Sequence, residues 1–365
     1  PSSSLGFAGH ALSLLLYCRS EYHAALAEPT SLPLSFSNIQ IGAHALKSAF
    51  ALAPMAGLTD VPFRTLAWHY GAAYMVSEMV SDKPQLWETG KSRLRRQGVP
   101  GMSPSAVQIA GTDPQVMADA ARRHADDGVE VIDINFGCPA KKVCKQSAGS
   151  ALLADIGLLG RIVESVAKAV ALPVTIKTRT GLVPGDGLGC AAAITAESAG
   201  AQLVTIHARS RACHFKGVVD YPAVARITRA VSIPVLVNGD ITTAAEARLA
   251  LHNSCAAGVM VGRGAIGQPW IFRELDGKPK PDYHERWAVV LEHVQSIHEF
   301  YGQQPGLQIA RKHIVAYANL LGFDVRACLR LERPEQQLKW LNEARDRMSE
   351  RQKNYEHHSE RAQAA

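Results

Sequence analysis

The sequence lacks several features that would assign it to a special class of protein. No apolar run approaches the roughly twenty residues that a membrane-spanning helix needs. The seven cysteines are odd in number and form no Cys-x-x-Cys pair, so we expect neither a disulfide framework nor a structural zinc site. No acidic trio or Cys/His cluster stands at metal-ligand spacing, so we also expect no metal. These absences predict a soluble, metal-free protein of the reducing cytoplasm.

Size and charge allow a large protein with a polyanionic partner. The 365 residues are 47% hydrophobic, enough for one big core plus a smaller domain. The net charge of +6 suits a nucleic acid, although an ordinary protein can carry the same excess. Two basic groups, Lys91 to Arg96 and Arg209 to Lys216, are candidate phosphate contacts, and solvated charged surface is the competing interpretation.

Short apolar runs alternate with alanine-rich helical stretches from about residue 48, which is typical of βα units around a parallel sheet. About eight units in about 220 residues favour a closed (β/α)₈ barrel over an open doubly wound sheet. Two clear helices between them are Pro114 to Asp127, with Asp113 as its N-cap, and Gly157 to Val170. The expected strands are Ser48 to Met55, Tyr74 to Met79, Ser105 to Ile109, Val129 to Asn135, Pro173 to Thr178, Leu203 to His207, Pro234 to Asn238 and Gly258 to Gly262.

The pattern changes after Phe272 to one with helices only, beyond the linker-like segment Gly277 to Pro281. We expect a barrel over residues 35–277, a helical domain over 278–353 and a disordered tail over 354–365. The helices expected there are Tyr283 to Tyr301, Gln308 to Leu321 and Pro334 to Lys353. Residues 1–34 are expected to form a poorly ordered extension. Balanced charges make a solvated helical bundle an alternative to a polyanion-binding surface.

The segment Asp133-Ile-Asn-Phe-Gly-Cys-Pro-Ala-Lys-Lys142 turns a buried strand directly into a polar turn. Barrel enzymes carry their chemistry at the carboxyl ends of the strands, which is where Cys138 falls. Its thiol can serve as a nucleophile or a proton donor. The alternative is a cysteine that acts as a small buried hydrophobe.

Other strand exits carry groups that suit an anionic ligand. Asn238-Gly-Asp240 and Gly262-Arg-Gly264 place glycines and a cation after the last two strands, where barrels often bind a phosphate. The alternative interpretation is that these glycines only permit tight turns between strand and helix. Lys177 and His207 end adjoining strands, where a buried lysine needs an anion or an electron-rich ring and the histidine can donate to a carbonyl or cap a loop.

Taken jointly, these motifs resemble the flavin-dependent tRNA-dihydrouridine synthases, and among them the bacterial B-type branch, from about residue 39 to 345. The order and spacing of the motifs make the resemblance specific. The matching stretches are Ala53-Pro-Met-Ala-Gly57, Val107-Gln-Ile-Ala-Gly111, Asp133 to Val143, Ala148-Gly-Ser-Ala-Leu-Leu153, Thr205-Ile-His-Ala-Arg209, Asn238-Gly-Asp240, Gln268-Pro-Trp-Ile-Phe272 and Ile309-Ala-Arg-Lys-His313.

The resemblance implies an enzyme that reduces a uridine of the tRNA D-loop to 5,6-dihydrouridine, with FMN in the barrel and NADPH as the electron donor. It implies a hydride from flavin to C6 and a proton from Cys138 to C5, and an ordinary thiol is protonated at neutral pH without an activating base. The residues implied to contact the flavin are Pro54, Met55, Ala56, Gln108, Lys177 and His207, with Asn238, Gly239, Asp240, Gly262 and Arg263 at its phosphate end. Those implied to orient the uracil are Asn135, Arg179 and Arg209.

The sequence departs from the usual B-type pattern at Phe136, Cys144 and Ala208, where methionine, asparagine and glycine are common. Cys144 places a second thiol six residues after Cys138, so it is an alternative proton donor. Two other functions stay open. One is an FMN barrel that acts on a small molecule, as dihydroorotate dehydrogenases do, and the other is a tRNA-binding chaperone without redox activity. A monomer is expected because no interface signal is visible.

Overall fold

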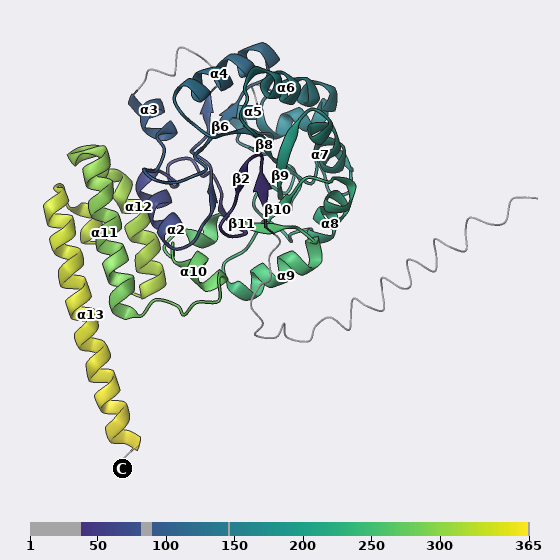
Figure 1. Cartoon of the computed structure of the whole chain (residues 1–365). Helices are drawn as coiled ribbons and strands as arrows, with labels where there is room; N and C mark the ends of the chain where they lie inside the picture. The colour runs from purple at the N-terminus through teal and green to yellow at the C-terminus, as the bar shows by residue number, and fades with distance from the viewer. Residues whose placement is uncertain (1–37, 82–89, 145–146, 364–365) are drawn as a thin grey trace, which may run out of the picture. The chain divides into compact units, whose positions relative to one another are not determined.

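The computed structural model describes residues 38–81, 90–144 and 147–363, which belong to one compact unit. Its centre is a sheet of nine parallel strands in the order β4-β3-β11-β10-β9-β8-β7-β6-β5 (Figure 1). The strands are β3 (Phe50–Leu52), β4 (Tyr74–Met75), β5 (Val80–Ser81), β6 (Ala106–Ala110), β7 (Val131–Asn135), β8 (Val174–Arg179), β9 (Ala201–His207), β10 (Val235–Asn238) and β11 (Gly258–Val261).

The sheet closes into the expected eight-stranded barrel because β4 and β5 are two parts of one barrel strand. A parallel bridge between Val76 and Ala106 joins this strand to β6, and the Ser77 N–H donates to the Ala106 carbonyl at 3.0 Å. The sequence predicted one unbroken strand from Tyr74 to Met79. The chain leaves the ladder where Ser77 and Glu78 turn their side chains to hydrogen bonds with neighbouring backbone.

Helices cover the outside of the barrel, as the alternation of the sequence predicted (Figure 1). Both clear helix predictions are confirmed to within a residue, and Asp113 caps α4 by accepting from the N–H groups of Gln115 and Val116 at 2.9 Å. The barrel helices are α2 (Val61–His69), α3 (Gly90–Arg96), α4 (Pro114–Asp126), α5 (Lys141–Cys144), α6 (Ile156–Ala169), α7 (Leu188–Ser198), α8 (Tyr221–Ala230), α9 (Ala244–Ser254) and α10 (Ile271–Leu275), with the 3₁₀ helices η2 (Gly149–Ala154) and η3 (Arg263–Ala265).

The amino-terminal end of the barrel is covered by a small hairpin, β1 (Gln40–Ile41) and β2 (His44–Ala45). Ile39, Ile41 and Leu46 from this region pack with side chains of the barrel strands in one buried cluster. The hairpin therefore closes one end of the barrel core with apolar side chains, and the polar strand exits lie at the other end.

Three long helices follow the barrel: α11 (Tyr283–Tyr301), α12 (Gln303–Leu321) and α13 (Pro334–Gln363), with the 3₁₀ turn η4 (Cys328–Arg330) between the last two. The helix predicted from Gln308 begins five residues earlier, because Pro305 lies in the first turn, where no backbone donor is needed. Gly306 fits there because a Cβ would come within 2.9 Å of His298 in α11. Helix α13 runs to Gln363, past the end expected at Lys353, since its sequence is rich in glutamate, arginine and glutamine.

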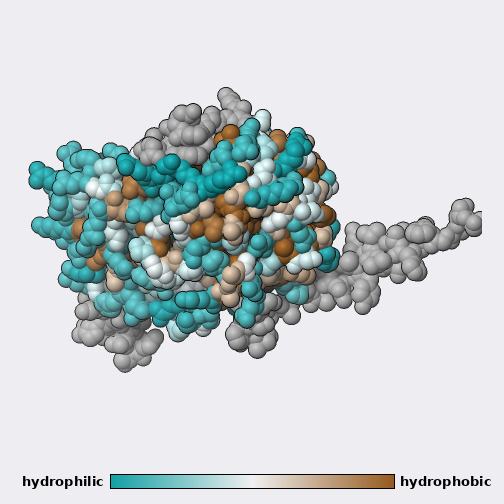
Figure 2. Space-filling view, turned by 45° about the horizontal axis from the view of Figure 1, so that its top comes forward, coloured by the Kyte–Doolittle hydropathy of each residue, from teal (hydrophilic) through white to brown (hydrophobic). Residues whose placement is uncertain are grey.

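These helices share a core with the barrel. Leu66 of α2 and Trp270 before α10 lie in one buried cluster with Trp287, Ile314 and other side chains of α11 and α12. The surface that Figure 2 shows is mainly hydrophilic, with separated hydrophobic patches. Among the described residues, no helix is long and apolar enough to cross a membrane.

Candidate active site

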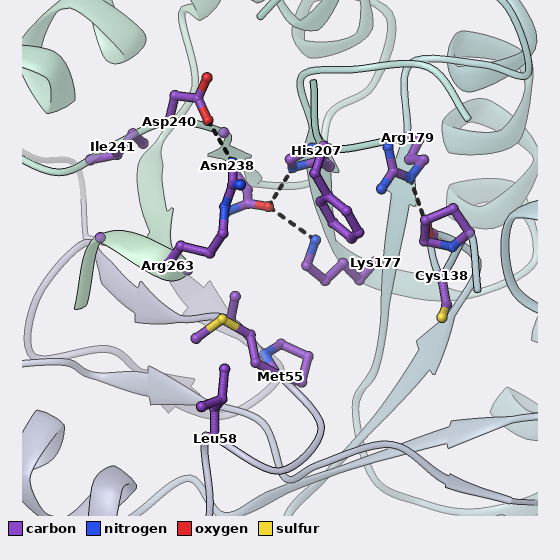
Figure 3. Close-up of a pocket in the computed structure, with 18 of the residues that line it drawn as sticks. Met55, Leu58, Cys138, Lys177, Arg179, His207, Asn238, Asp240, Ile241 and Arg263 are labelled. Carbon is purple, nitrogen blue, oxygen red and sulfur yellow. Dashed lines mark hydrogen bonds and ion pairs between the residues drawn. The ribbon is translucent and has the colours of Figure 1, made fainter. Parts of the chain in front are cut away.

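A cavity of about 650 Å³ lies at the carboxyl ends of the barrel strands (Figure 3). This volume is typical of small-molecule and cofactor sites. One wall is apolar, formed by Ala53, Pro54, Met55 and Leu58, and the remainder carries most of the polar side chains that the sequence predicted. The predicted residues that line it are Pro54, Met55, Ala56, Gln108, Asn135, Cys138, Lys177, Arg179, His207, Asn238, Gly239, Asp240, Gly262 and Arg263.

The Cys138 turn is anchored on a chain of hydrogen bonds from the barrel interior. Asn135 ends β7, and its Oδ1 accepts from the N–H groups of Gly137 and Cys138 at 3.2 and 2.9 Å. Its Nδ2 donates to Gln108 Oε1 at 2.8 Å, and Gln108 Nε2 donates to Asp133 at 2.7 Å. Burial raises the pKa of Asp133 to about 6. Asn135 and Gln108 therefore fix the position of the thiol-bearing turn.

The second thiol lies away from the cavity. Cys144 is absent from the cavity lining, and its Sγ contacts the carbonyl oxygen of Cys138 at 3.5 Å and Ser150 Oγ at 3.7 Å. Ser150 Oγ donates to the same carbonyl at 2.9 Å. The geometry therefore favours Cys138 over Cys144 as the group that reaches a bound substrate.

Lys177 places an ammonium group in the cavity, and the hydrogen-bond partner of this group is the side-chain amide of Asn238. Its Nζ donates to Asn238 Oδ1 at 3.2 Å (Figure 3). Burial, together with the nearby Arg179, lowers the pKa of Lys177 to about 8. A lysine in these surroundings is costly unless an electron-rich or anionic group accepts from it. It therefore fits a ligand with acceptor atoms.

His207 offers the cavity a hydrogen-bond acceptor. Its Nδ1 lies 2.8 Å from Asn238 Oδ1, while Asn238 Nδ2 donates to the Met260 carbonyl at 2.7 Å. The amide orientation assigns the imidazole proton to Nδ1. Burial, followed by the charges of Lys177 and Arg179, lowers the pKa of His207 to about 3, so the ring is neutral. Its Nε2 is buried without a hydrogen-bond partner in the structure and can accept from a ligand.

Arg179 is mostly committed to the protein backbone. Its Nε donates to the Gly137 carbonyl at 2.7 Å, and its Nη1 donates to the carbonyls of Ser210 and His214 at 3.1 and 2.7 Å. It lines the cavity beside Cys138, so it joins the thiol-bearing turn to the loop after β9 (Figure 3).

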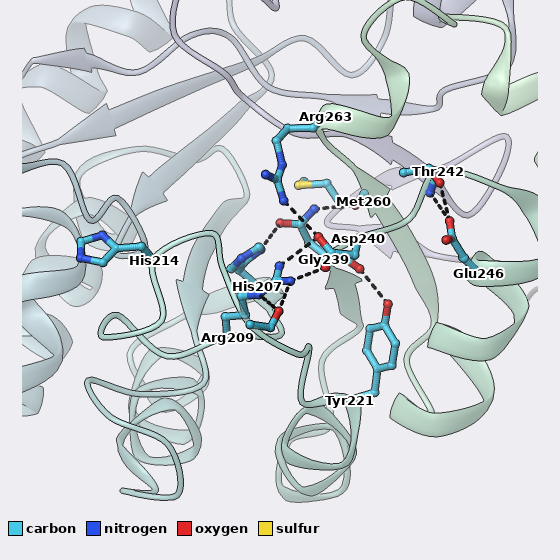
Figure 4. A network of polar contacts seen from close by, with 12 residues as sticks. His207, Arg209, His214, Tyr221, Gly239, Asp240, Thr242, Glu246, Met260 and Arg263 are labelled. Carbon is cyan, nitrogen blue, oxygen red and sulfur yellow. Dashed lines mark hydrogen bonds and ion pairs between the residues drawn. The ribbon is translucent and has the colours of Figure 1, made fainter. Parts of the chain in front are cut away.

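Arg209 is the one predicted site residue that the structure leaves out of the cavity lining. It is buried beneath Asp240, to which it donates through Nη1 at 3.0 Å and also through Nη2 (Figure 4). These hydrogen bonds keep the pKa of Asp240 low. Its Nε and Nη2 also donate to the Gly217 carbonyl at 3.1 and 2.6 Å. Arg209 therefore supports the loops around the cavity.

Near β10 and β11, the cavity is bordered by an exposed arginine and by two loops whose backbones lie close together. Arg263 is 61% exposed, and its Nη2 donates to Asp240 at 3.0 Å (Figure 4). Asp240 adopts a φ of 46°, and its charge is shared by Arg209 and Arg263. At Gly264 a Cβ would lie 2.0 Å from the Ile241 carbonyl, so this close approach of two loops requires glycine.

Sequence reasoning missed several residues that complete the cavity, among them Leu58, Met79, Phe215, Thr242 and Glu246. Phe215 stands between the basic residues of a group that the sequence did single out. Its place after an expected strand exit was the signal that could have found it. The residues that the structure describes hold no group of three or more His, Cys, Asp or Glu side chains suited to a metal ion.

Comparisons with known proteins give a consistent family and fold. The family model "Dihydrouridine synthase (Dus)" matches residues 51–362. The tRNA-dihydrouridine synthase B of Pseudomonas putida is 46% identical over 288 residues, which cover 77% of this chain and 86% of that protein. The protein of the same name from Pasteurella multocida is 44% identical over 286 residues, covering 76% and 86%.

The structure also resembles a solved structure of another barrel protein. An asparagine-to-alanine mutant of morphinone reductase in complex with tetrahydroNAD superposes with a TM-score of 0.50 and 14% identity, covering 70% of this chain and 94% of that chain. At this identity the likeness shows the barrel fold alone.

Proposed function

The chain belongs to the dihydrouridine synthase family, and from that premise we propose that it reduces a uridine in the D-loop of tRNA to 5,6-dihydrouridine with FMN and NADPH. The observation that carries the proposal is the single cavity that brings together the Cys138 thiol, the Lys177 ammonium and the unpartnered Nε2 of His207. The enzyme is accordingly a flavin-dependent oxidoreductase of the tRNA-dihydrouridine synthase type.

The residues of the cavity suit a flavin. The apolar wall of Pro54, Met55 and Leu58 offers a surface for a flat ring. Lys177 Nζ and His207 Nε2 offer a donor and an acceptor for the polar edge of that ring, and both need such a partner. Asn238, Gly239 and Gly262, together with Arg263, would hold the phosphate end.

The negative charge of Asp240 would repel a phosphate at this end of the cavity unless a cation neutralises it. Arg209 is buried and stays with Asp240, whereas Arg263 is exposed and has room to turn. Arg263 would therefore turn its guanidinium to the phosphate, while Arg209 alone neutralises Asp240.

The reaction adds two hydrogens across the C5–C6 bond of uracil. FMN, when bound and reduced by NADPH, would supply the hydride for C6. Cys138 gives its thiol proton to C5 and regains a proton from solvent. Arg179, beside Cys138, would orient the uracil carbonyl groups, and Asn135 would act through the backbone that it holds rather than by touching uracil. A deep cavity suits a base that has left its stack.

Our candidates for contact with the tRNA backbone are the helices α11 to α13 and the basic group Lys91 to Arg96. The donor preference for NADPH, the monomeric state and the cytoplasmic location stay predictions. A barrel that acts on a small molecule explains the cavity but gives the helical segment no function.

The experiment that tests the proposal is anaerobic. The purified flavin-loaded protein is reduced with NADPH, unmodified tRNA is added, and the flavin absorbance is followed. We expect rapid reoxidation that depends on tRNA, with dihydrouridine in the product. A bound flavin that is reduced but ignores a competent tRNA would favour a small-molecule substrate. Failure to bind FMN would contradict the assignment of the cavity.

A further inference from the structure

Phe215 stands out among the exposed apolar side chains of the described residues. It is 52% exposed, and it is the aromatic member of the large exposed hydrophobic side chains found there. It lines the active-site cavity on the loop after β9. Ligand cavities are lined by aromatic side chains together with a few polar groups, so the position of this ring at the cavity, more than its exposure, points to contact with a ligand.

The protein holds the backbone around Phe215 in place. On one side, Arg179 Nη1 donates to the carbonyl of His214 at 2.7 Å. On the other side, Arg209 donates to the carbonyl of Gly217 at 3.1 and 2.6 Å. Both arginines are almost completely buried, and their guanidinium groups bind these carbonyls. The loop is therefore fixed although the ring at its tip is exposed.

The residue before the ring is also in a conformation that side chains seldom adopt. His214 has a φ of 50°, in the left-handed region, and Gly217 has a φ of 77°. A non-glycine residue in this region costs free energy and persists where the surroundings impose it. The two carbonyl contacts supply that constraint, and the result is a turn that presents Phe215.

Two guanidinium groups lie close to the Phe215 ring. The guanidinium carbon of Arg179 is 5.2 Å from the ring centroid and that of Arg263 is 5.8 Å from it. His207 meets the ring edge-on, with the centroids 6.1 Å apart. Arg179 comes from β8 and Arg263 follows β11, so the ring spans the cavity mouth between the thiol end and the phosphate end.

We propose that Phe215 is a preorganised stacking platform for a tRNA base next to the uridine that is reduced. Unpaired bases stack on aromatic side chains of RNA-binding proteins, and each base has a flat face that suits this contact. Enzymes that flip a base also read or grip the nucleotides that flank it. This inference rests on the proposed function, because it assigns the neighbour of the substrate uridine.

The test uses the full chain loaded with FMN and an unmodified tRNA transcript. In Phe215→Ala, we expect tRNA to bind about 5- to 150-fold more weakly in fluorescence anisotropy, the range for loss of one stacked base. The slope of log K against log salt stays that of wild type, because no phosphate contact is lost. The anaerobic rate of flavin reduction by NADPH is measured in parallel, because Phe215 lines the same cavity, and we expect the loss of tRNA affinity to exceed any change in that rate.

Two further variants distinguish aromatic stacking from an apolar contact that any hydrophobic side chain could make. Phe215→Tyr keeps an aromatic face and is expected to bind tRNA like the wild type, whereas Phe215→Leu is expected to resemble Phe215→Ala. The matched control is Val218→Ala, because Val218 is 90% exposed on the same loop and does not line the cavity. It is expected to bind tRNA normally.

Three results would overturn the platform: wild-type affinity in Phe215→Ala, wild-type affinity in Phe215→Leu, or an equal loss in Val218→Ala. Slower reduction by NADPH with unchanged tRNA binding would assign the ring to the dinucleotide and also overturn it. The proposed function fails separately, since in that case the wild-type enzyme itself is not reoxidised by tRNA.

Discussion

At the residue scale, two thiols close together in sequence have different surroundings. Cys138 lines the cavity, whereas the Cys144 thiol faces the Cys138 carbonyl and Ser150. We expect Cys138→Ala to keep its flavin but to lose dihydrouridine formation by roughly 10²- to 10⁴-fold, the contribution of a general acid. Single-turnover reoxidation by tRNA measures this loss.

Cys144→Ala is the matched control for that prediction. It removes a thiol from the same turn without changing the cavity lining, so its turnover should stay close to that of the wild type. Full activity of Cys138→Ala together with loss in Cys144→Ala would exchange the two roles.

Lys177 makes folding of the flavin-free protein depend on pH. Its pKa falls from 10.5 in the unfolded chain to about 8 in the fold, so between these values the unfolded chain binds the extra proton. Stability therefore rises as the pH rises from about 8 to 10.5. Below pH 8 the buried charge costs on the order of 3 kcal/mol.

We expect Lys177→Met to unfold at a higher urea concentration than the wild type at pH 7, because no cation is buried. The advantage should shrink as the pH rises from 8 to 10. Equal midpoints for the two proteins at pH 7 would mean that Lys177 is solvated in the folded state. The same variant should bind FMN more weakly, which a flavin fluorescence titration measures.

At the element scale, the strand exits were predictable and the loops beyond them were not. Each of these exits is an apolar run that ends in a polar residue, so Lys177, His207 and Asn238 could be assigned to one end of the barrel from the sequence. Arg209 could not. Its N–H donates to the His207 carbonyl at 2.6 Å, so the chain turns over two residues and alternation along the strand no longer holds.

The same limit applies to Asn135 and Phe215. The sequence placed Asn135 at the cavity correctly, but its hydrogen bonds to Gln108 and to the Cys138 turn depend on the neighbouring strand. Phe215 depends on two carbonyl contacts from arginines on β8 and after β9. Contacts between elements that are distant in sequence leave no periodic signal for either residue.

The junction of α2 with α11 carries a prediction at this scale. Trp287 is fully buried in the cluster with Leu66, and its ring centroid lies 4.9 Å from that of Phe323. Trp287→Ala should lower the free energy of unfolding by about 3–5 kcal/mol. Because α11 to α13 are candidates for holding the tRNA, reoxidation by tRNA should slow more than reduction by NADPH. Equal effects on the two half-reactions would separate these helices from tRNA binding.

At the scale of the whole molecule, the barrel and the helices depend on each other. Trp270, which follows the last barrel strand, stacks with Tyr317 of α12 at 6.4 Å, and Phe63 of α2 stacks with His313 at 5.5 Å. Removal of the helical segment would expose these rings to water. Point variants therefore test its function better than a truncated chain does.

Buried ionisable groups on both sides of this junction set the response of the whole protein to acid. Burial lowers the pKa of His207 to about 3 and of His313 to about 4, and that of His293 well below its usual value. Burial raises the pKa of Asp60 and of Asp133 to about 6. Between pH 6 and 4, the unfolded chain therefore carries a proton on each of these three histidines, whereas the fold carries one on each of the two carboxyls.

The net difference of one proton in favour of the unfolded chain makes stability fall as the pH falls from 6 to 4. These five groups contribute a slope of about 1.4 kcal/mol per pH unit to the free energy of unfolding of the flavin-free protein, measured by urea denaturation. Burial also lowers the pKa of His124 and of His298, so both make the slope steeper in the same direction. His313→Phe removes one of the three histidines while it keeps a ring against Phe63, so the slope should fall by about 1.4 kcal/mol per pH unit. An unchanged slope in this variant would show that His313 is protonated in the fold. It would also mean that water reaches the junction, because a protonated ring there needs a solvating partner.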